Sequence, residues 1–184
     1  MADYYTGIET SLANADFTTG QNKADLVISE RRNVTIHQLS FFAEETAKIT
    51  SFCKKIGLAG LPDFSQLIAT KQHLQAARVE IGKIWLIGDG SVAELPSSFY
   101  PLKISSSKVI LRLSGVRASD VIARICAVDF RDDKRNFMAT GIHHVPCHIF
   151  HEDGVFDIYM PRSFAQSLTD LILDISAQYH VQMA

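Results

Sequence analysis

Five residues that could bind a metal or act in catalysis lie close together in the C-terminal third of the chain: His143, His144, Cys147, His148 and His151. Imidazole and thiolate groups are the ligands that zinc prefers. The residues around them predict a strand, on which alternate side chains share a face and four residues span roughly 13 Å. Zinc ligands lie only about 2.0–2.3 Å from the metal, so His143 and His151 cannot both reach an ion held by Cys147. A pair such as His144 and His148 could contribute only with outside ligands, and we therefore predict an edge or interfacial strand without zinc.

Other polar residues that could bind a ligand are scattered along the sequence. Arg162 could bind a carboxylate or phosphate through its planar guanidinium, but a structural tie at the start of the last predicted helix is the favoured interpretation. Gly88-Asp89-Gly90 and Ser114-Gly115 indicate turns, because neither GxGxxG nor GxxxxGK[ST] is present. Lys103 and Lys108 indicate a solvated surface. No set of nucleophile, base and orienting acid can be assembled, so we expect no catalytic, cofactor-binding or metal-binding residue in this chain.

Composition limits the classes of partner. The 184 residues carry a formal net charge of −2, which argues against nucleic acid as the main ligand. Cys53, Cys126 and Cys147 are odd in number and far apart, as expected of reduced thiols in the cytoplasm. The first residues lack a secretory signal, and no apolar run approaches the roughly 18 residues of a membrane-spanning helix. The mixed charges of residues 129–135 are typical of a solvated loop.

Weak periodicity and many Thr, Asn, Asp and Ser residues predict an extended arm over residues 1–33, which is followed by a single domain over residues 34–184. The predicted elements of that domain are a strand over 34–39, a helix over 42–56, a loop with a short helix over 57–78, strands over 81–87 and 103–113, a helix over 121–128, a hairpin of 139–150 and 155–159, and a helix over 163–179. Asp153-Gly154 is the turn signal of the hairpin. Ser163 and Gln166 fit a capping box at the start of the last helix. Trp85 and the pair Phe41-Phe42 are expected in the core.

This order of elements predicts an α+β fold with an antiparallel sheet and helices packed on one face, of ferredoxin-like type. No internal repeat or low-complexity tract interrupts it.

The C-terminal half resembles the gamma-subunit family of heterotetrameric sarcosine oxidase. The resemblance is carried by residues 109–115, 118–130 and 159–165, within which Pro161-Arg162-Ser163-Phe164-Ala165 is the most specific run. Trp85, on a strand before Gly88, is also similar to the family. The resemblance covers roughly residues 34–180, whereas the first 30 residues and the histidines of 143–151 depart from the family pattern.

The resemblance implies a fold related to the folate-binding domain of the glycine-cleavage aminomethyltransferase. It also implies a cytoplasmic, non-catalytic subunit of an enzyme that oxidises N-methyl amino acids and passes the one-carbon unit to tetrahydrofolate. FAD, FMN, NAD, tetrahydrofolate and zinc would then belong to the partners, which are the larger alpha- and beta-type flavoprotein chains and a small zinc-binding subunit. This chain itself would hold no cofactor and would contact neither nucleic acid nor membrane.

Two other functions remain open from the residues alone. A free-standing folate-binding domain would need a concave site with convergent polar groups, and the sequence identifies none. An independent hydrolase or metalloenzyme would need a catalytic constellation, which is also not recognisable.

Overall fold

A computed structural model describes residues 8, 12, 24–69, 74–88, 95–130 and 136–184. The chain forms two compact units. Unit 1 comprises Met1–Arg32, Ser107–Asp133 and Ala139–Ala184, and unit 2 comprises Asn33–Ser106 and Lys134–Met138. Unit 2 is thus mainly an insertion in the sequence of unit 1. Among the described residues, no helix has the length and apolar character needed to cross a membrane.

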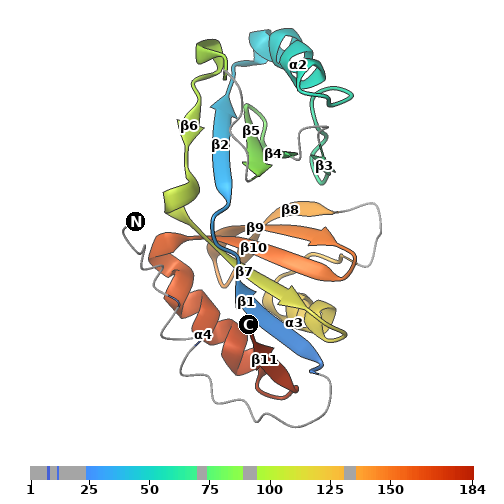
Figure 1. Ribbon diagram of the computed structural model, residues 1–184, viewed down its shortest axis with the longest axis vertical. Helices are drawn as coiled ribbons and strands as arrows, with labels where there is room; N and C mark the ends of the chain where they lie inside the picture. Colours follow the sequence, from blue (N-terminus) through green and yellow to red (C-terminus); the bar gives the residue numbers. More distant parts are fainter. Residues whose placement is uncertain (1–7, 9–11, 13–23, 70–73, 89–94, 131–135) are drawn as a thin grey trace. The chain divides into compact units, whose positions relative to one another are not determined.

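A six-stranded sheet forms the centre of unit 1 (Figure 1). Its strands, in spatial order, are β11 (Val181–Met183), β1 (Leu26–Glu30), β7 (Lys108–Ser114), β10 (Val155–Pro161), β9 (Val145–Glu152) and β8 (Phe137–Ile142). β1 runs parallel to β11 and antiparallel to β7, and β10 is antiparallel to both β7 and β9. The sheet therefore joins strands from both ends of the chain.

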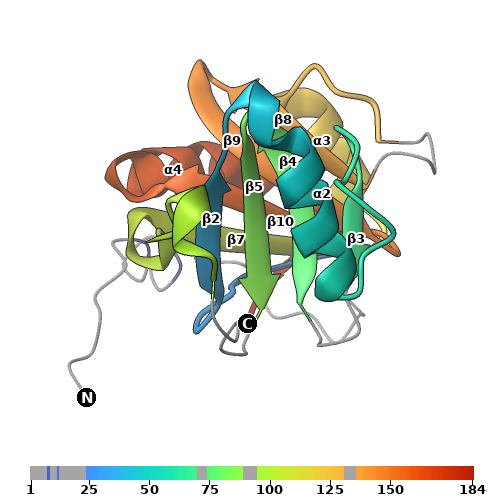
Figure 2. The ribbon, with the colours of Figure 1, turned by 90° about the horizontal axis from the view of Figure 1, so that it is seen from above.

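Two helices cover one face of this sheet. They are α3 (Ala118–Ile125) and α4 (Ala165–Ser176), which contact each other and lie on the same side of the strands (Figures 1 and 2). The strands present buried apolar side chains to that face, among them Leu111 on β7 and Ile158 on β10, which are paired across the two strands. The alternation along β7 predicted this face, because Val109, Leu111 and Leu113 are all buried as expected.

Unit 2 contains a five-stranded sheet with one helix. The strand order is β3 (Leu67–Ala69), β4 (Gln75–Glu80), β5 (Lys83–Gly88), β2 (Thr35–Ser40) and β6 (Leu102–Lys103), and α2 (Thr46–Lys55) crosses one face (Figure 2). Ile49, Phe52 and Cys53 of α2 belong to the same buried cluster as Leu39 and Leu86 of the sheet. Short 3-10 turns complete the described elements: η1 (Ala43–Glu45), η2 (Ser97–Phe99), η3 (Ser105–Ser107) and η4 (Arg162–Phe164).

The expected fold class is confirmed, since antiparallel sheets with helices on one face form an α+β fold. The strand at 34–39, the helix beginning after residue 42 and the hairpin closed by Asp153-Gly154 all occur close to their predicted positions. The helix predicted over 121–128 is also present, but it begins and ends three residues earlier, at Ala118 and Ile125. Trp85 and Phe41 are buried as predicted, but Phe42 is 61% exposed.

Two segments in the first half of the chain differ from the prediction. Residues 26–30, assigned to the arm, form β1 inside the sheet, where Leu26 and Ile28 are fully buried. The apolar alternation of this strand is short and follows a long polar segment, so it does not stand out in the sequence. Residues 67–69 and 75–80 form β3 and β4 instead of a loop with a short helix. The antiparallel pairing of β4 with β5 supplies the hydrogen bonds that local propensity did not suggest.

Three further differences concern the second half. The predicted strand over 103–113 is broken by η3, where the Ser105 hydroxyl accepts a hydrogen bond from the Ile36 backbone at 2.9 Å. The predicted strand over 139–150 is two strands, β8 and β9. The last helix begins after η4, and Ser163 makes no capping hydrogen bond, so the predicted capping box is wrong.

Candidate functional site

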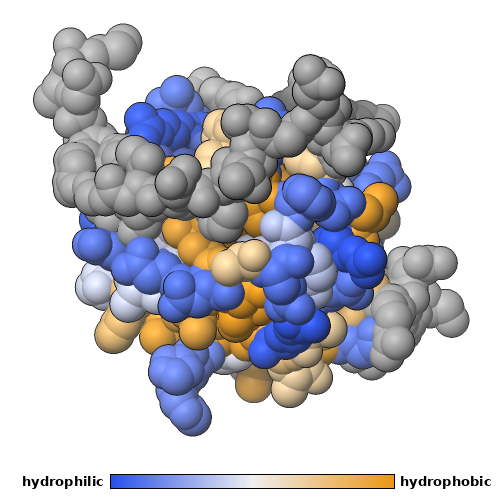
Figure 3. Space-filling view, turned by 90° about the horizontal axis from the view of Figure 1, so that it is seen from below, coloured by the Kyte–Doolittle hydropathy of each residue, from blue (hydrophilic) through white to orange (hydrophobic). Residues whose placement is uncertain are grey.

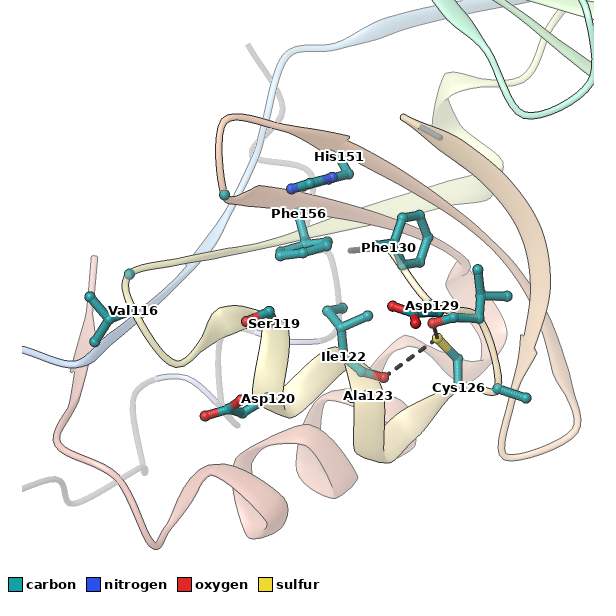
Figure 4. Close-up of a pocket in the computed structure, with 14 residues that line it drawn as sticks. Val116, Ser119, Asp120, Ile122, Ala123, Cys126, Asp129, Phe130, His151 and Phe156 are labelled. Carbon is teal, nitrogen blue, oxygen red and sulfur yellow. Dashed lines mark hydrogen bonds between the residues drawn. The ribbon is translucent and has the colours of Figure 1, made fainter. Parts of the chain in front are cut away.

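A cavity of about 730 Å³ opens in unit 1 between α3, the segment that follows it and the β9–β10 hairpin (Figure 4). All of its lining residues belong to unit 1. Those that determine its chemistry are Ser119, Ile122, Cys126, Phe130, His151 and Phe156. The cavity is within the size range of small-molecule sites, which are typically concave and mostly apolar.

Gly115 fixes the position of α3 relative to the sheet. It lies directly after β7 with φ +106°, a conformation that residues with a side chain rarely adopt. A Cβ atom at this position would lie 2.5 Å from the backbone oxygen of Asp25. The glycine therefore allows β7 to turn sharply into α3, whose Val121 and Ile122 are buried while Ser119 lines the cavity.

The opposite wall of the cavity is aromatic. His151 on β9 and Phe156 on β10 are paired across the hairpin, and their rings stack with centroids 4.3 Å apart and planes at 9°. Phe130 lies edge-on to both rings, with centroids 5.7 Å from Phe156 and 6.0 Å from His151 (Figure 4). The two-residue turn Asp153-Gly154, with both φ angles positive, produces this register. A flat apolar or aromatic group would find complementary contacts against this wall.

Cys126 supplies a thiol to the cavity, but not an activated one. Its Sγ donates to the Ile122 carbonyl oxygen at 3.4 Å and lies 4.0 Å from that of Val128. Burial raises the pKa of this thiol, so the nucleophilic thiolate is disfavoured at neutral pH. Within the described residues, no hydrogen bond joins Cys126 to His151.

The charge at the edge of the cavity is partly neutralised. Asp120 is paired with Arg117 at 3.0 Å, and Asp129 is the other acidic residue in the lining. The described lining therefore combines aromatic and aliphatic walls with a few polar groups. It is suited to binding and contains no hydrogen-bonded series of nucleophile, base and orienting acid.

The five clustered residues predicted from the sequence lie in different environments. His143 and His144 form the turn between β8 and β9, with φ +47° and +68°, and both are exposed. Cys147 is buried, and desolvation raises its pKa to about 11. Burial and, secondarily, the charge of Lys108 lower the pKa of His148 to about 4.

His151 is the member of this group that lines the cavity. Among described residues, no three His, Cys, Asp or Glu side chains are placed to hold a metal ion together. The prediction that these histidines lie on a single strand is wrong, because the His143-His144 turn separates β8 from β9. The absence of zinc stays a prediction.

The remaining sequence candidates can be placed as follows. Arg162 is a half-buried residue at the start of η4, and Gly115 occupies the predicted turn. Gly88 ends β5, while Asp89, Gly90 and the charged residues 131–135 lie outside the described residues. Lys103 lies on β6 and is exposed, whereas Lys108 is half-buried at the start of β7.

Sequence reasoning did not identify the cavity. From the sequence, Cys126 is predicted only to be a reduced thiol, and Phe130 belongs only to a segment that resembles the family. His151 is considered only as a possible zinc ligand. The one available signal was the Asp153-Gly154 turn, which fixes the pairing of His151 with Phe156. The approach of α3 to this hairpin depends on tertiary packing.

No protein-family model matches the chain, and no curated protein sequence matches it. Solved structures with a similar fold were found, and two of them are described here. One is the heterotetrameric sarcosine oxidase from Corynebacterium sp. U-96 in complex with pyrrole 2-carboxylate, with a TM-score of 0.72, 14% identity, and coverage of 96% of this chain and 95% of that chain. The other is the glycine cleavage system aminomethyltransferase T from Bartonella henselae, with a TM-score of 0.60, 14% identity, and coverage of 88% of this chain.

The chain spans 48% of the length of that aminomethyltransferase, compared with almost a complete chain of the oxidase. Both neighbours match the resemblance drawn from the sequence, which is therefore confirmed at the level of the fold.

Proposed function

We propose that this chain is a non-catalytic structural subunit of a heterotetrameric, flavin-dependent complex that oxidises an N-methyl amino acid, as its likeness to sarcosine oxidase suggests. The observation that carries the proposal is the coverage of the structural match. The chain accounts for 95% of one chain of a heterotetrameric oxidase but for only 48% of an aminomethyltransferase. A fold that fills a whole subunit of an assembly is readily explained as a subunit of a similar assembly.

The chemistry of the cavity supports a binding role in preference to a catalytic one. Its thiol is buried and donates to a backbone carbonyl, and its imidazole is stacked on Phe156. Among the described residues, neither group has the partner that an activated nucleophile or general base requires. The hard step would fall to flavin held by partner chains.

An exposed aromatic pair in unit 2 supports contact with another chain. Phe42 and Tyr100 are 61% and 62% exposed, and their rings meet edge to face with centroids 6.3 Å apart. Tyr100 has φ +44°, an uncommon backbone conformation for a non-glycine residue. Hydrophobic residues also reach the surface between hydrophilic ones on the face drawn in Figure 3. Aromatic side chains are enriched at the centres of protein interfaces.

The partners that we propose are a larger alpha-type and a beta-type flavoprotein chain and a small zinc-binding subunit. FAD, FMN, NAD, tetrahydrofolate and zinc would be bound by those chains, in the cytoplasm. The one-carbon unit released by oxidation would pass to tetrahydrofolate.

The test is isolation of the complex from its native cells through an affinity tag on this chain. We expect larger chains to elute with the tagged one, flavin absorbance to follow them in gel filtration, and sarcosine to support peroxide formation or reduction of an electron acceptor. Changing both Phe42 and Tyr100 to Ser should reduce recovery of the partner chains. Phe164→Ser is the matched control, because Phe164 is an aromatic residue of unit 1, is 48% exposed and does not line the cavity.

The alternative, a free-standing folate-binding domain, makes the opposite prediction. The tagged chain would elute as a monomer without flavin and would bind tetrahydrofolate in isothermal titration calorimetry. That result would overturn the subunit proposal.

A further inference from the structure

Two arginines share one buried carboxylate at the centre of the sheet in unit 1. Arg112 on β7 faces Asp157 on β10, and its Nε and Nη2 donate to the two carboxylate oxygens at 2.7 and 2.8 Å. Arg31 follows β1 directly, and its Nη1 donates to Asp157 Oδ2 at 2.7 Å. The backbone N–H of Arg31 donates to the Ile110 carbonyl at 2.9 Å, which anchors it beside β7. β1, β7 and β10 are adjacent strands (Figure 1).

The cluster carries more donors and more positive charge than Asp157 can satisfy. A guanidinium has five N–H donors; Arg31 uses one of its five here and Arg112 uses two. No other hydrogen bond joins these two guanidinium groups to the part of the chain that the structure describes. Two cations and one carboxylate leave a net charge of +1.

The same three side chains differ in their access to water. The side chain of Asp157 is 9% exposed, whereas those of Arg31 and Arg112 are 29% and 39% exposed. The carboxylate is therefore held inside the protein, and the guanidiniums extend from it to the surface. Because Asp157 already restricts both arginines, little conformational entropy remains to be lost when they bind another anion.

The charges nearby favour a monoanion. Glu152, an exposed residue at the end of β9, acts electrostatically on Arg112 but makes no ion pair with it among the described residues. Its negative charge would oppose a dianion such as phosphate more strongly than a carboxylate. A carboxylate also matches the planar, two-donor edge of a guanidinium.

We propose that Arg31 and Arg112 form a binding site for a carboxylate group, on the side of the sheet away from α3 and α4. The site is independent of the proposed subunit role. Its ligand can be a small carboxylic acid or an Asp or Glu side chain of another protein chain, because the recognised group is the same.

The test is a titration of the full-length, ¹⁵N-labelled chain with sodium acetate, against sodium chloride at equal ionic strength. The reporter is the chemical shift of the Arg112 Nε–H group, which is fixed in one environment by its hydrogen bond to Asp157. We expect a saturable shift with acetate that chloride does not reproduce. Arg31→Gln removes one charged donor and leaves Arg112 bound to Asp157, so it should weaken acetate binding by about tenfold to a hundredfold.

Two variants make the test specific. Arg117→Gln also breaks an arginine–aspartate pair, but Arg117 is paired one-to-one with Asp120, and acetate binding should be unchanged. Glu152→Gln removes the competing negative charge and should tighten binding. Equal affinity in the wild type and Arg31→Gln would overturn the site, and tighter binding of phosphate than of acetate would overturn its assignment to a carboxylate.

The source of the carboxylate follows from the same titration on the tagged complex described above. A retained acetate response there assigns the site to a small molecule. A response lost in the complex but present in the isolated chain assigns it to an acidic side chain of a partner. Both outcomes can be distinguished from failure of the subunit proposal. If that proposal fails, no complex forms, but the isolated chain still binds acetate.

Discussion

Asp157 is the buried acid on which three strands converge, and its removal should be costly. Asp157→Asn would leave Arg31 and Arg112 facing each other without a counter-charge. Breaking a fully buried pair costs about 3–5 kcal/mol, and we expect less here because both guanidiniums are partly exposed to water. Urea denaturation of the variant measures the loss. Asp120→Asn, which breaks only the exposed pair with Arg117, should have almost no effect, and equal losses would contradict the account.

His148 should make the stability depend on pH. Its pKa is lowered to about 4 in the folded chain, first by burial and then by the charge of Lys108, whereas an unfolded imidazole titrates near about 6.5. Between these values only the unfolded chain binds the proton. The free energy of unfolding should therefore fall as the pH falls from about 6.5 to about 4, by at most about 1.4 kcal/mol per pH unit, with no contribution above that range.

Urea denaturation between pH 4 and 7 measures this dependence in the wild type and in His148→Gln. In His148→Gln, the free energy of unfolding should depend much less on pH over this range than in the wild type. His144→Gln, which changes an exposed residue of the β8–β9 turn, is the control and should retain the wild-type dependence. A slope unaffected by His148→Gln would mean that another group is responsible.

At the scale of the elements, the turn from β7 into α3 depends on one glycine. Gly115→Ala would place a methyl group against the Asp25 carbonyl at a positive φ, and we expect a loss of about 1–3 kcal/mol in the free energy of unfolding. Gly141→Ala is the control, because no atom lies within 4 Å of the added Cβ and the backbone there is not in the left-handed region. Thermal unfolding of the two variants would distinguish them, and an unchanged melting temperature for Gly115→Ala would contradict the geometry.

The last helix is held by its buried face and not by a side-chain cap. Ser163 is exposed and makes no capping bond, so Ser163→Ala should leave stability almost unchanged. Ile172 on α4 is fully buried, and Ile172→Ala should cost about 2–5 kcal/mol. Chemical denaturation tests both. A larger loss for Ser163→Ala than for Ile172→Ala would mean that the helix begins earlier than residue 165.

Periodicity was a good guide to elements whose burial is visible locally. The stripe of Ile49, Phe52 and Cys53 predicted α2, and the Asp153-Gly154 pair predicted the hairpin, because both signals involve neighbours in sequence. The His143-His144 turn was missed because histidine is not a strong turn residue, although Asn, Asp and His tolerate positive φ.

Other features depend on partners distant in sequence and could not be predicted locally. β1 is too short to stand out until β7 and β11 pair with it. For the same reason, no local pattern could bring Arg31 to Asp157, 126 residues later in the chain, or α3 to His151. The α+β class was predictable, but neither the cavity nor the arginine pair was.

At the scale of the whole molecule, the subunit proposal predicts that activity depends on the presence of this chain and not on single polar side chains. Alanine at Arg162, His144 or Cys147 should leave turnover of the assembled complex within about tenfold, whereas loss of a true general acid or base typically costs about a hundredfold or more. Turnover is measured with an N-methyl amino acid and normalised to flavin content. A substitution that abolishes turnover while preserving assembly and flavin would move the chemistry onto this chain.

The position of β1 between β11 and β7 has a consequence for biosynthesis. β1 leaves the ribosome well before its neighbour β7, which begins only at Lys108, after nearly all of unit 2 has been made. At about 5–20 residues per second, the wait is on the order of ten seconds. During that time the edges of β1 and its apolar residues Leu26 and Ile28 are without their native neighbours. Nascent chains stalled before residue 108 should therefore recruit holdase chaperones through this strand, and full-length released chains, which contain both β7 and β11, should not.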